Sequence, residues 1–170
     1  MVLRLEAVPN SSDWLNMARC AFFVGQAENA LNACNRVIEG EPDSGYAHSL
    51  AGHILFNNGH LDEATRHLSL ATLLSPEDPQ AWLLLSDIYR LNGELQRSLE
   101  TLRAAVLAVP HSGALHFALA KAFLEFGLPS DALALLREAF HLAPDSPDIA
   151  WKLAKTLHEL GHTTEARLIL

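Results

Sequence analysis

Nine histidines and two cysteines are the residues of this 170-residue chain that suggest metal or catalytic chemistry. A structural zinc site gathers about four such ligands in one place. The only histidines four residues apart are His158 and His162, and Gly161 between them is expected to end their helix and remove the shared face. No further histidine or cysteine completes a set around Cys20 and Cys34, which we expect to be small buried residues. We therefore predict no metal site.

Other patterns that carry catalysis are also missing from the sequence. It contains no nucleophile elbow, no phosphate-binding glycine loop and no assembled pair of acid–base carboxylates. The adjacent acids at 62–63 and 77–78 occupy expected turns or helix starts, where the helix dipole favours carboxylates. We therefore predict that this segment is not an enzyme by itself and binds no cofactor.

The glycines and prolines instead mark a repeat that must position any binding residues. Both keep a period of 34 residues without insertion: Gly25, Gly59, Gly93, Gly127 and Gly161, with Pro42, Pro76, Pro110 and Pro144. A strict period of this length is typical of stacked helical repeats, in which each unit packs only on its neighbours.

The unit that starts at Pro79 shows the plan of one repeat. A first helix is expected near 79–91. The Asp78 side chain can cap it, and Pro79 fits its first position, where the missing N–H costs no hydrogen bond. Residues 92–93 end this helix, and a second helix follows near 95–108 until Pro110 prevents continuation. Two antiparallel helices of this length cannot bury their apolar faces alone, so the sequence predicts stacked helix pairs.

Small residues recur at two positions of each second helix, where it must approach the first helix closely. The first position holds Ala30, Ala64, Ser98, Ala132 and Ala166, and the second holds Val37, Ala71, Ala105 and Ala139. A large side chain at either position would overpack the helix pair.

These residues resemble the tetratricopeptide repeat family, whose unit carries the pattern W-x2-L-G-x2-Y, then A-x3-F and a closing proline. The third unit matches it directly with Trp82, Leu85, Tyr89, Ala105 and Pro110. The resemblance implies an all-α fold, a right-handed α–α superhelix (solenoid) of antiparallel helix pairs. It divides a single array over residues 1–170 into the units 11–44, 45–78, 79–112, 113–146 and an incomplete 147–170.

Both ends of the sequence are typical of a segment of a longer array. Residues 2–6 resemble the end of a preceding second helix, to which we assign residues 1–10, and the last unit ends on the apolar residues 168–170 without a closing proline. A frayed N-terminus and a short last helix are the alternative.

The family resemblance implies a concave ligand groove on the face of each first helix opposite to the pair's core. At about 100° per residue, positions 4, 7, 8 and 11 of a unit face the core, and positions 2, 5, 6, 9, 12 and 13 face the groove. The residues that we assign to partner binding are Arg19, Phe22, Phe23, Tyr46, His53, Phe56, Asn57, Leu83, Asp87, Arg90, Phe117, Lys121, Leu124, Trp151 and Lys155.

This face is unusually apolar for a surface, with Leu84 adding to the residues above, and exposed apolar area often marks a binding site. Burial against neighbouring first helices is an equal alternative for the fifth-position residues, whereas binding is favoured for Phe22 and Phe56. We also expect His53 to make binding depend on pH.

The resemblance implies a protein–protein interaction scaffold that binds a peptide or an amphipathic helix in an apolar concave groove. The family's carboxylate clamp is not expected, since Leu15, Arg19 and Leu50 occupy its positions. Two alternatives stay open: a substrate-recruiting repeat arm of an enzyme such as a glycosyltransferase, and a scaffold that forms a homo-oligomer through its exposed repeat ends.

Composition and charge restrict the partners further. The formal net charge of −8 argues against nucleic acid, because phosphate binding needs clustered lysines and arginines. No apolar run reaches membrane-spanning length, and no signal peptide is recognised. We expect protein or peptide partners, no nucleic acid, no membrane and a cytoplasmic location.

We predict that Ala64→Leu lowers the melting temperature of the chain. A long side chain at this small position overpacks the helix pair, at a cost of roughly 1–3 kcal/mol in the free energy of unfolding. Thermal unfolding followed by circular dichroism measures the change, and an unchanged melting temperature contradicts this packing scheme.

Overall fold

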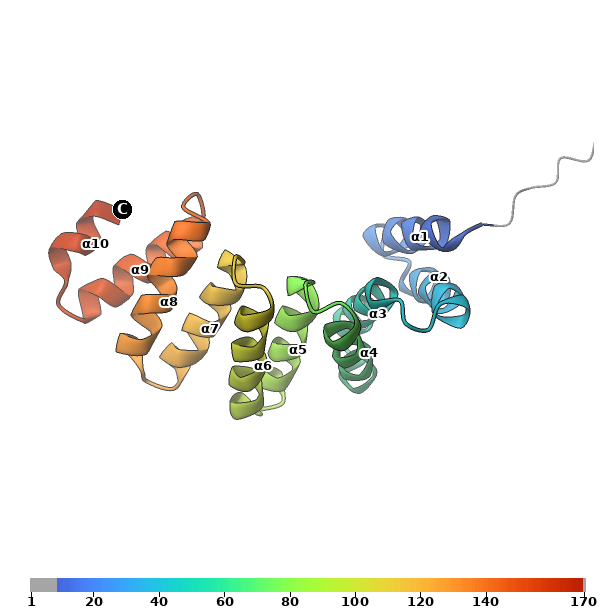
Figure 1. Cartoon of the computed structure of the whole chain (residues 1–170), viewed down its shortest axis with the longest axis horizontal. Coiled ribbons are helices and arrows are strands. Elements are labelled where there is room, and N and C mark those ends of the chain that lie inside the picture. Colours follow the sequence, from blue (N-terminus) through green and yellow to red (C-terminus); the bar gives the residue numbers. More distant parts are fainter. Residues whose placement is uncertain (1–8, 170) are drawn as a thin grey trace, which may run out of the picture. The chain divides into compact units, whose positions relative to one another are not determined.

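The computed structural model describes residues 9–169, and the elements within this range are ten α-helices (Figure 1). The helices are α1 Ser11–Phe23, α2 Ala27–Gly40, α3 Gly45–Asn57, α4 Leu61–Leu74, α5 Pro79–Leu91, α6 Leu95–Ala108, α7 Gly113–Glu125, α8 Pro129–Leu142, α9 Pro147–Glu159 and α10 Thr163–Ile169. The helix proposed for residues 2–6 lies outside the described residues.

The prediction of an all-α fold built from antiparallel helix pairs is confirmed for the described part of the chain. α5 and α6 have the bounds expected from the sequence, 79–91 and 95–108. The first helix of each pair begins 34 residues after the one before it, at Ser11, Gly45, Pro79, Gly113 and Pro147.

Glycine closes the first helix of every pair in a left-handed conformation. Gly59 has φ = 78°, its N–H donates to the carbonyl oxygen of Phe56 at 3.0 Å, and the N–H of His60 donates to the carbonyl oxygen of Leu55 at 3.0 Å. A side chain at this φ would strain the backbone, which explains why the glycine period is strict.

The sequence places capping residues before three first helices, residues 10–13 before α1, Asp78 before α5 and Ser146 before α9, and the expected side-chain caps are confirmed at the first two. The Asp78 carboxylate accepts from the backbone N–H of Gln80 at 3.0 Å, and Asn10 and Asp13 each accept from the other's backbone N–H at 3.0 Å. Ser146 occupies the cap position of α9, but its side chain makes no capping hydrogen bond, so the prediction of a side-chain cap there was wrong.

The chain forms two compact units, divided between Ser75 and Pro76. In the first unit, α3 packs on α1 and α2 and on its own partner helix α4. Ala64 is fully buried, and a Cβ added to Gly52 of α3 would lie 2.6 Å from Cγ of Leu68 on α4. The two helices therefore approach so closely that only glycine fits opposite Leu68 without a shift.

The second unit repeats this packing over α5–α10. α7 packs on α5, α6 and α8, and α9 packs on α8 and α10. Leu136, Leu153 and Leu157 are fully buried between α8 and α9, and the small residue Ala166 of α10 belongs to the same core.

The buried stripe of each first helix is wider than the sequence predicts. The sixth-position residues Leu50 and Leu84, expected in the groove, are only 9% and 6% exposed. Leu50 packs with Ile54 on the core formed by α1 and α2. For Leu50 the prediction was wrong because α3 packs on the preceding pair α1–α2 as well as on α4, and these contacts cover two sides of the helix.

The two cysteines have different surroundings. Cys34 is buried in the first core as expected, and desolvation raises the pKa of its thiol to about 12. Cys20 is exposed, so the expectation of burial was wrong for it. It occupies the tenth position of its unit, which Ile54 fills in α3 by packing on a preceding helix pair, and no described helix precedes α1.

A histidine pair joins α3 to α4 within the first unit. Nε2 of buried His48 lies 3.0 Å from the carbonyl oxygen of Pro42 and must therefore carry the proton that it donates. In the tautomer that this bond requires, Nδ1 of His48 accepts the hydrogen bond of Nδ1–H of His67, 2.9 Å away. Burial and the neighbouring His48 lower the pKa of His67, Arg66 lowers it further and Glu63 opposes the shift.

We predict that this pair weakens the fold in acid. The pKa of folded His67 lies below its ordinary value of 6.5, so the unfolded chain binds this proton more readily and stability falls as pH drops below that value. His67→Gln keeps a donor for His48 and removes the titration. The loss of melting temperature between pH 7.5 and 5.5, about one unit on each side of the ordinary histidine pKa, should be smaller in His67→Gln than in the wild type. Equal losses contradict the assigned role.

Candidate partner-binding surface

The fifteen residues assigned to binding all lie on first helices, and none of them is buried. The exposed ones are Arg19, Phe23, Tyr46, Asn57, Arg90, Lys121, Trp151 and Lys155, and the half-buried ones are Phe22, His53, Phe56, Leu83, Asp87, Phe117 and Leu124. Several half-buried residues, such as Phe22 and Leu83, also pack against a core. These residues form what we call the first-helix faces of the two units.

In the first unit the first-helix face is aromatic where α1 meets α3. The rings of Phe22 and His53 meet edge to face with centroids 4.9 Å apart. Burial lowers the pKa of His53, so its ring is neutral at neutral pH and packs as an aromatic group. Phe23 points elsewhere: it is 92% exposed and lines a separate cavity of about 530 Å³ on α1 with Arg19 and Cys20.

In the second unit the corresponding face is charged. α5, α6 and α7 enclose a cavity of about 220 Å³, which we call the α5–α7 cavity. Its charged lining residues are Asp87, Arg90, Lys121 and Glu125, and its other lining residues are Ser86, Ser98, Leu102, Ala118 and Ala122. Three residues assigned from the sequence therefore meet around one space.

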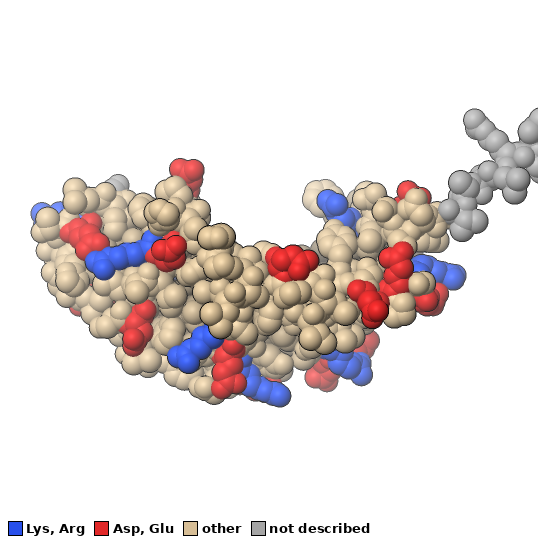
Figure 2. Space-filling view, viewed as in Figure 1, with Lys and Arg blue, Asp and Glu red and all other residues tan. Residues whose placement is uncertain are grey.

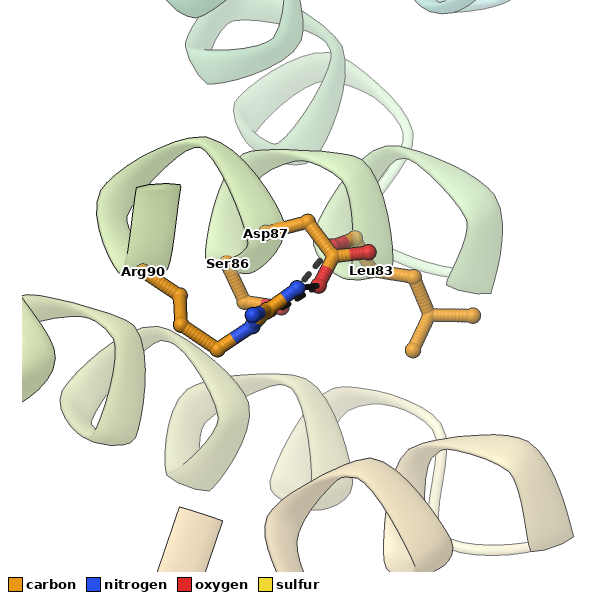
Figure 3. Close-up of polar contacts among 4 residues, drawn as sticks. All are labelled: Leu83, Ser86, Asp87 and Arg90. Atoms are coloured by element: carbon orange, nitrogen blue, oxygen red, sulfur yellow. Dashed lines mark hydrogen bonds and ion pairs between the residues drawn. The ribbon is translucent and has the colours of Figure 1, made fainter. Parts of the chain in front are cut away.

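The charges of the α5–α7 cavity are only partly neutralised within the described chain. Arg90 donates to Oδ1 of Asp87 at 3.0 Å along α5, and the hydroxyl of Ser86 donates to the carbonyl oxygen of Leu83 at 2.8 Å (Figure 3). Lys121 lies 5.2 Å from the centroid of the Phe117 ring and makes no ion pair with a described carboxylate. Lys121 and Glu125 are thus available to a ligand.

A third cavity, which we call the terminal pocket, lies between α9 and α10 and has a volume of about 430 Å³. It is lined by Trp151, Ala154, Lys155 and His158 of α9 and by Thr163, Ala166 and Arg167 of α10. The sequence assigned Trp151 and Lys155 to binding but missed Arg167 and Thr163, because residues of a second helix were placed outside the groove.

Within residues 9–169, no group of three or more histidine, cysteine or acidic side chains is arranged to hold a metal ion. α9 ends at Glu159, so His158 and His162 do not share one helix, as expected. None of the described helices is both long enough and apolar enough to cross a membrane.

Charged residues are mixed over the face that Figure 2 shows. Acidic and basic side chains stand singly or beside one another, with uncharged residues between most of them. On this face the described residues form no continuous basic surface of the kind that binds a nucleic-acid backbone.

Two sequence models with the description "Tetratricopeptide repeat" match the chain, one over residues 21–88 and 123–170 and the other over residues 79–108. The Cell division cycle protein 27 homolog of Caenorhabditis elegans is 31% identical over 81 residues, which are 48% of this chain and 10% of that protein. The chain therefore spans about a tenth of this curated relative.

Solved structures share the fold at low sequence identity. Pseudomonas aeruginosa pilF matches with a TM-score of 0.81 and 15% identity over 94% of this chain and 72% of that chain. YrrB, described as a TPR protein with an unusual peptide-binding site, matches with a TM-score of 0.68 and 17% identity over 94% of this chain and 82% of that chain. These similarities support the predicted α–α solenoid.

We predict that the Phe22 ring shields the His53 imidazole from solvent. Phe22→Ala opens the imidazole to water and should raise the pKa of His53 back toward 6.5. A proton NMR titration measures it, with the His53 signal identified by His53→Gln. Leu73→Ala, which removes an exposed side chain on α4, should leave that pKa unchanged. An unshifted pKa in Phe22→Ala contradicts the contact.

Proposed function

The chain belongs to the tetratricopeptide repeat family, and we propose from this premise that it binds a peptide or an amphipathic helix on its first-helix faces. Its fold is that of a protein–protein interaction scaffold. The proposal adds the location of the site and the kind of segment that the site accepts.

The observation that carries the proposal is the meeting of assigned residues from different repeats. Phe22 of α1 touches His53 of α3, and Arg90 of α5 lines the same cavity as Lys121 of α7. Each case joins the twelfth position of one first helix to the ninth position of the next. A ligand lying across successive first helices would contact both members of such a pair at once.

The two faces would recognise different features of a ligand. The aromatic contact of the first unit gives affinity through burial of apolar side chains. The α5–α7 cavity offers an ammonium group and a carboxylate at a partly enclosed position, which favours a ligand with matching charges and gives selectivity. An amphipathic segment carries both kinds of group.

One similar protein supports peptide recognition. YrrB is described as having a peptide-binding site, and we extend the same kind of ligand to this chain. Because the match to the Cell division cycle protein 27 homolog covers a tenth of that protein, we propose nothing from its whole activity. We keep the proposals of a non-catalytic segment and a cytoplasmic location. An enzyme's repeat arm and a self-assembling scaffold stay as alternatives.

The test is selection of ligands from a random peptide library displayed on phage against the full chain, followed by calorimetry on the selected peptides. We expect Lys121→Glu to weaken the binding of peptides that contact the second unit by about tenfold, since reversal of a charge removes one attraction and adds a repulsion.

Arg103→Glu is the matched control. Arg103 also lies over a phenylalanine ring, that of Phe123 at 5.4 Å, but it belongs to the second helix α6. Arg103→Glu should keep the affinity for the selected peptides within about twofold of the wild-type value. If the selected peptides bind Lys121→Glu and Phe22→Ala as tightly as the wild type, the ligand lies elsewhere and the proposal is overturned.

A further inference from the structure

The terminal pocket between α9 and α10 has a charge opposite to that of the whole chain. The chain has 20 acidic and 12 basic residues, yet the lining of this pocket contains Lys155, His158 and Arg167 and no aspartate or glutamate. In a protein of negative net charge, the two cationic side chains Lys155 and Arg167 around one space form a local attraction for anions.

The pocket also has an apolar surface. Trp151 is 52% exposed, and the small buried residues Ala154 and Ala166 leave space beside it. The ammonium groups of Lys152 and Lys155 each lie 5.2 Å from the centroid of the Trp151 ring. An apolar side chain that entered the pocket would therefore meet an indole ring with cations around it.

Two acids close in sequence to the pocket residues, Glu165 and Glu159, do not neutralise this pocket. Glu165 accepts two hydrogen bonds from Arg137 of α8, at 3.1 and 2.8 Å, which directs its carboxylate onto α8. Glu159 lies 3.8 Å from the Lys155 ammonium in an exposed pair, and such pairs contribute little and are readily displaced. Arg167 makes no ion pair with any carboxylate that the structure describes.

We propose that the terminal pocket binds an acidic segment of a partner protein, in which several carboxylates flank one aromatic side chain. The aromatic side chain packs on Trp151 above the two alanines, and the carboxylates accept hydrogen bonds from Lys155 and Arg167. The inference rests on the proposed function, to which it adds the chemistry of one partner segment.

The direct test is fluorescence anisotropy with the labelled heptapeptide acetyl-DEDFEDE-amide as the probe. Two matched probes isolate its features: acetyl-NQNFQNQ-amide removes the charges, and acetyl-DEDSEDE-amide removes the ring. Each should bind at least about tenfold more weakly than acetyl-DEDFEDE-amide. Added salt should lower the affinity of acetyl-DEDFEDE-amide more than that of the other two probes. Equal binding of the charged and uncharged probes overturns the proposal.

The matched variants are Lys155→Glu/Arg167→Glu and Arg66→Glu/Arg103→Glu. Both double variants change the net charge equally, but only the first alters the pocket, since Arg66 and Arg103 lie on α4 and α6. We expect about tenfold weaker binding in the first and a change within about twofold in the second. Equal effects would show that net charge alone drives binding and would overturn the site.

The indole N–H signal of Trp151 in a proton–nitrogen spectrum, identified by Trp151→Phe, gives a second readout. It should shift when the acidic probe binds, and an unmoved signal contradicts the assigned pocket. If light scattering shows that the chain is a dimer and the probe does not bind, the assigned occupant is wrong.

Failure of this inference and failure of the proposed function give different results. If library peptides bind with the expected dependence on Lys121 while the acidic probe does not bind, only the terminal pocket is rejected. If the acidic probe binds with the expected dependence on Arg167 while no library peptide depends on Phe22 or Lys121, the pocket stands, and the proposed binding at the α1–α3 contact and the α5–α7 cavity is rejected.

Discussion

Burial of the first helices α3, α7 and α9 on two sides is the constraint on which the rest of the structure depends. In a pair of thirteen- and fourteen-residue helices, the first helix has more apolar surface than the second helix can cover. It therefore also packs on the pair before it, where such a pair is present. α3 shows both contacts: Gly52 allows close approach to Leu68 of α4, and Leu50 with Ile54 completes the core of α1 and α2. The side that stays uncovered is the side available to a ligand.

Local chemistry made the helices predictable. Glycine at positive φ, proline after the second helix and a capping Asp78 act over a few residues, so the bounds of α5 and α6 followed from the sequence. The width of the core did not follow, because a helical projection assumes one neighbour, and Leu50 has contacts on a second side. Cys20 was misplaced for the opposite reason: it was expected to be buried as a small apolar residue, and no described helix precedes α1 to cover it.

The candidate site was only partly predictable for a related reason. The fifteen assigned residues occupy surface positions that helical spacing can identify, and Phe22 does contact His53. Arg167 was missed because its role depends on how α10 lies against α9, and Ser86 was assigned to the core although it also lines the α5–α7 cavity. Cavities form between elements, and spacing within one element carries no information about them.

Packing between neighbours has a consequence for the speed of folding. Within each compact unit, every well-populated contact between helices joins elements that are adjacent or next but one along the chain. Forming such contacts closes only short loops, which costs little entropy, and chains dominated by local contacts fold in microseconds to milliseconds. A unit of this kind emerging from the ribosome can therefore gain structure pair by pair, before the residues that follow it have been synthesised.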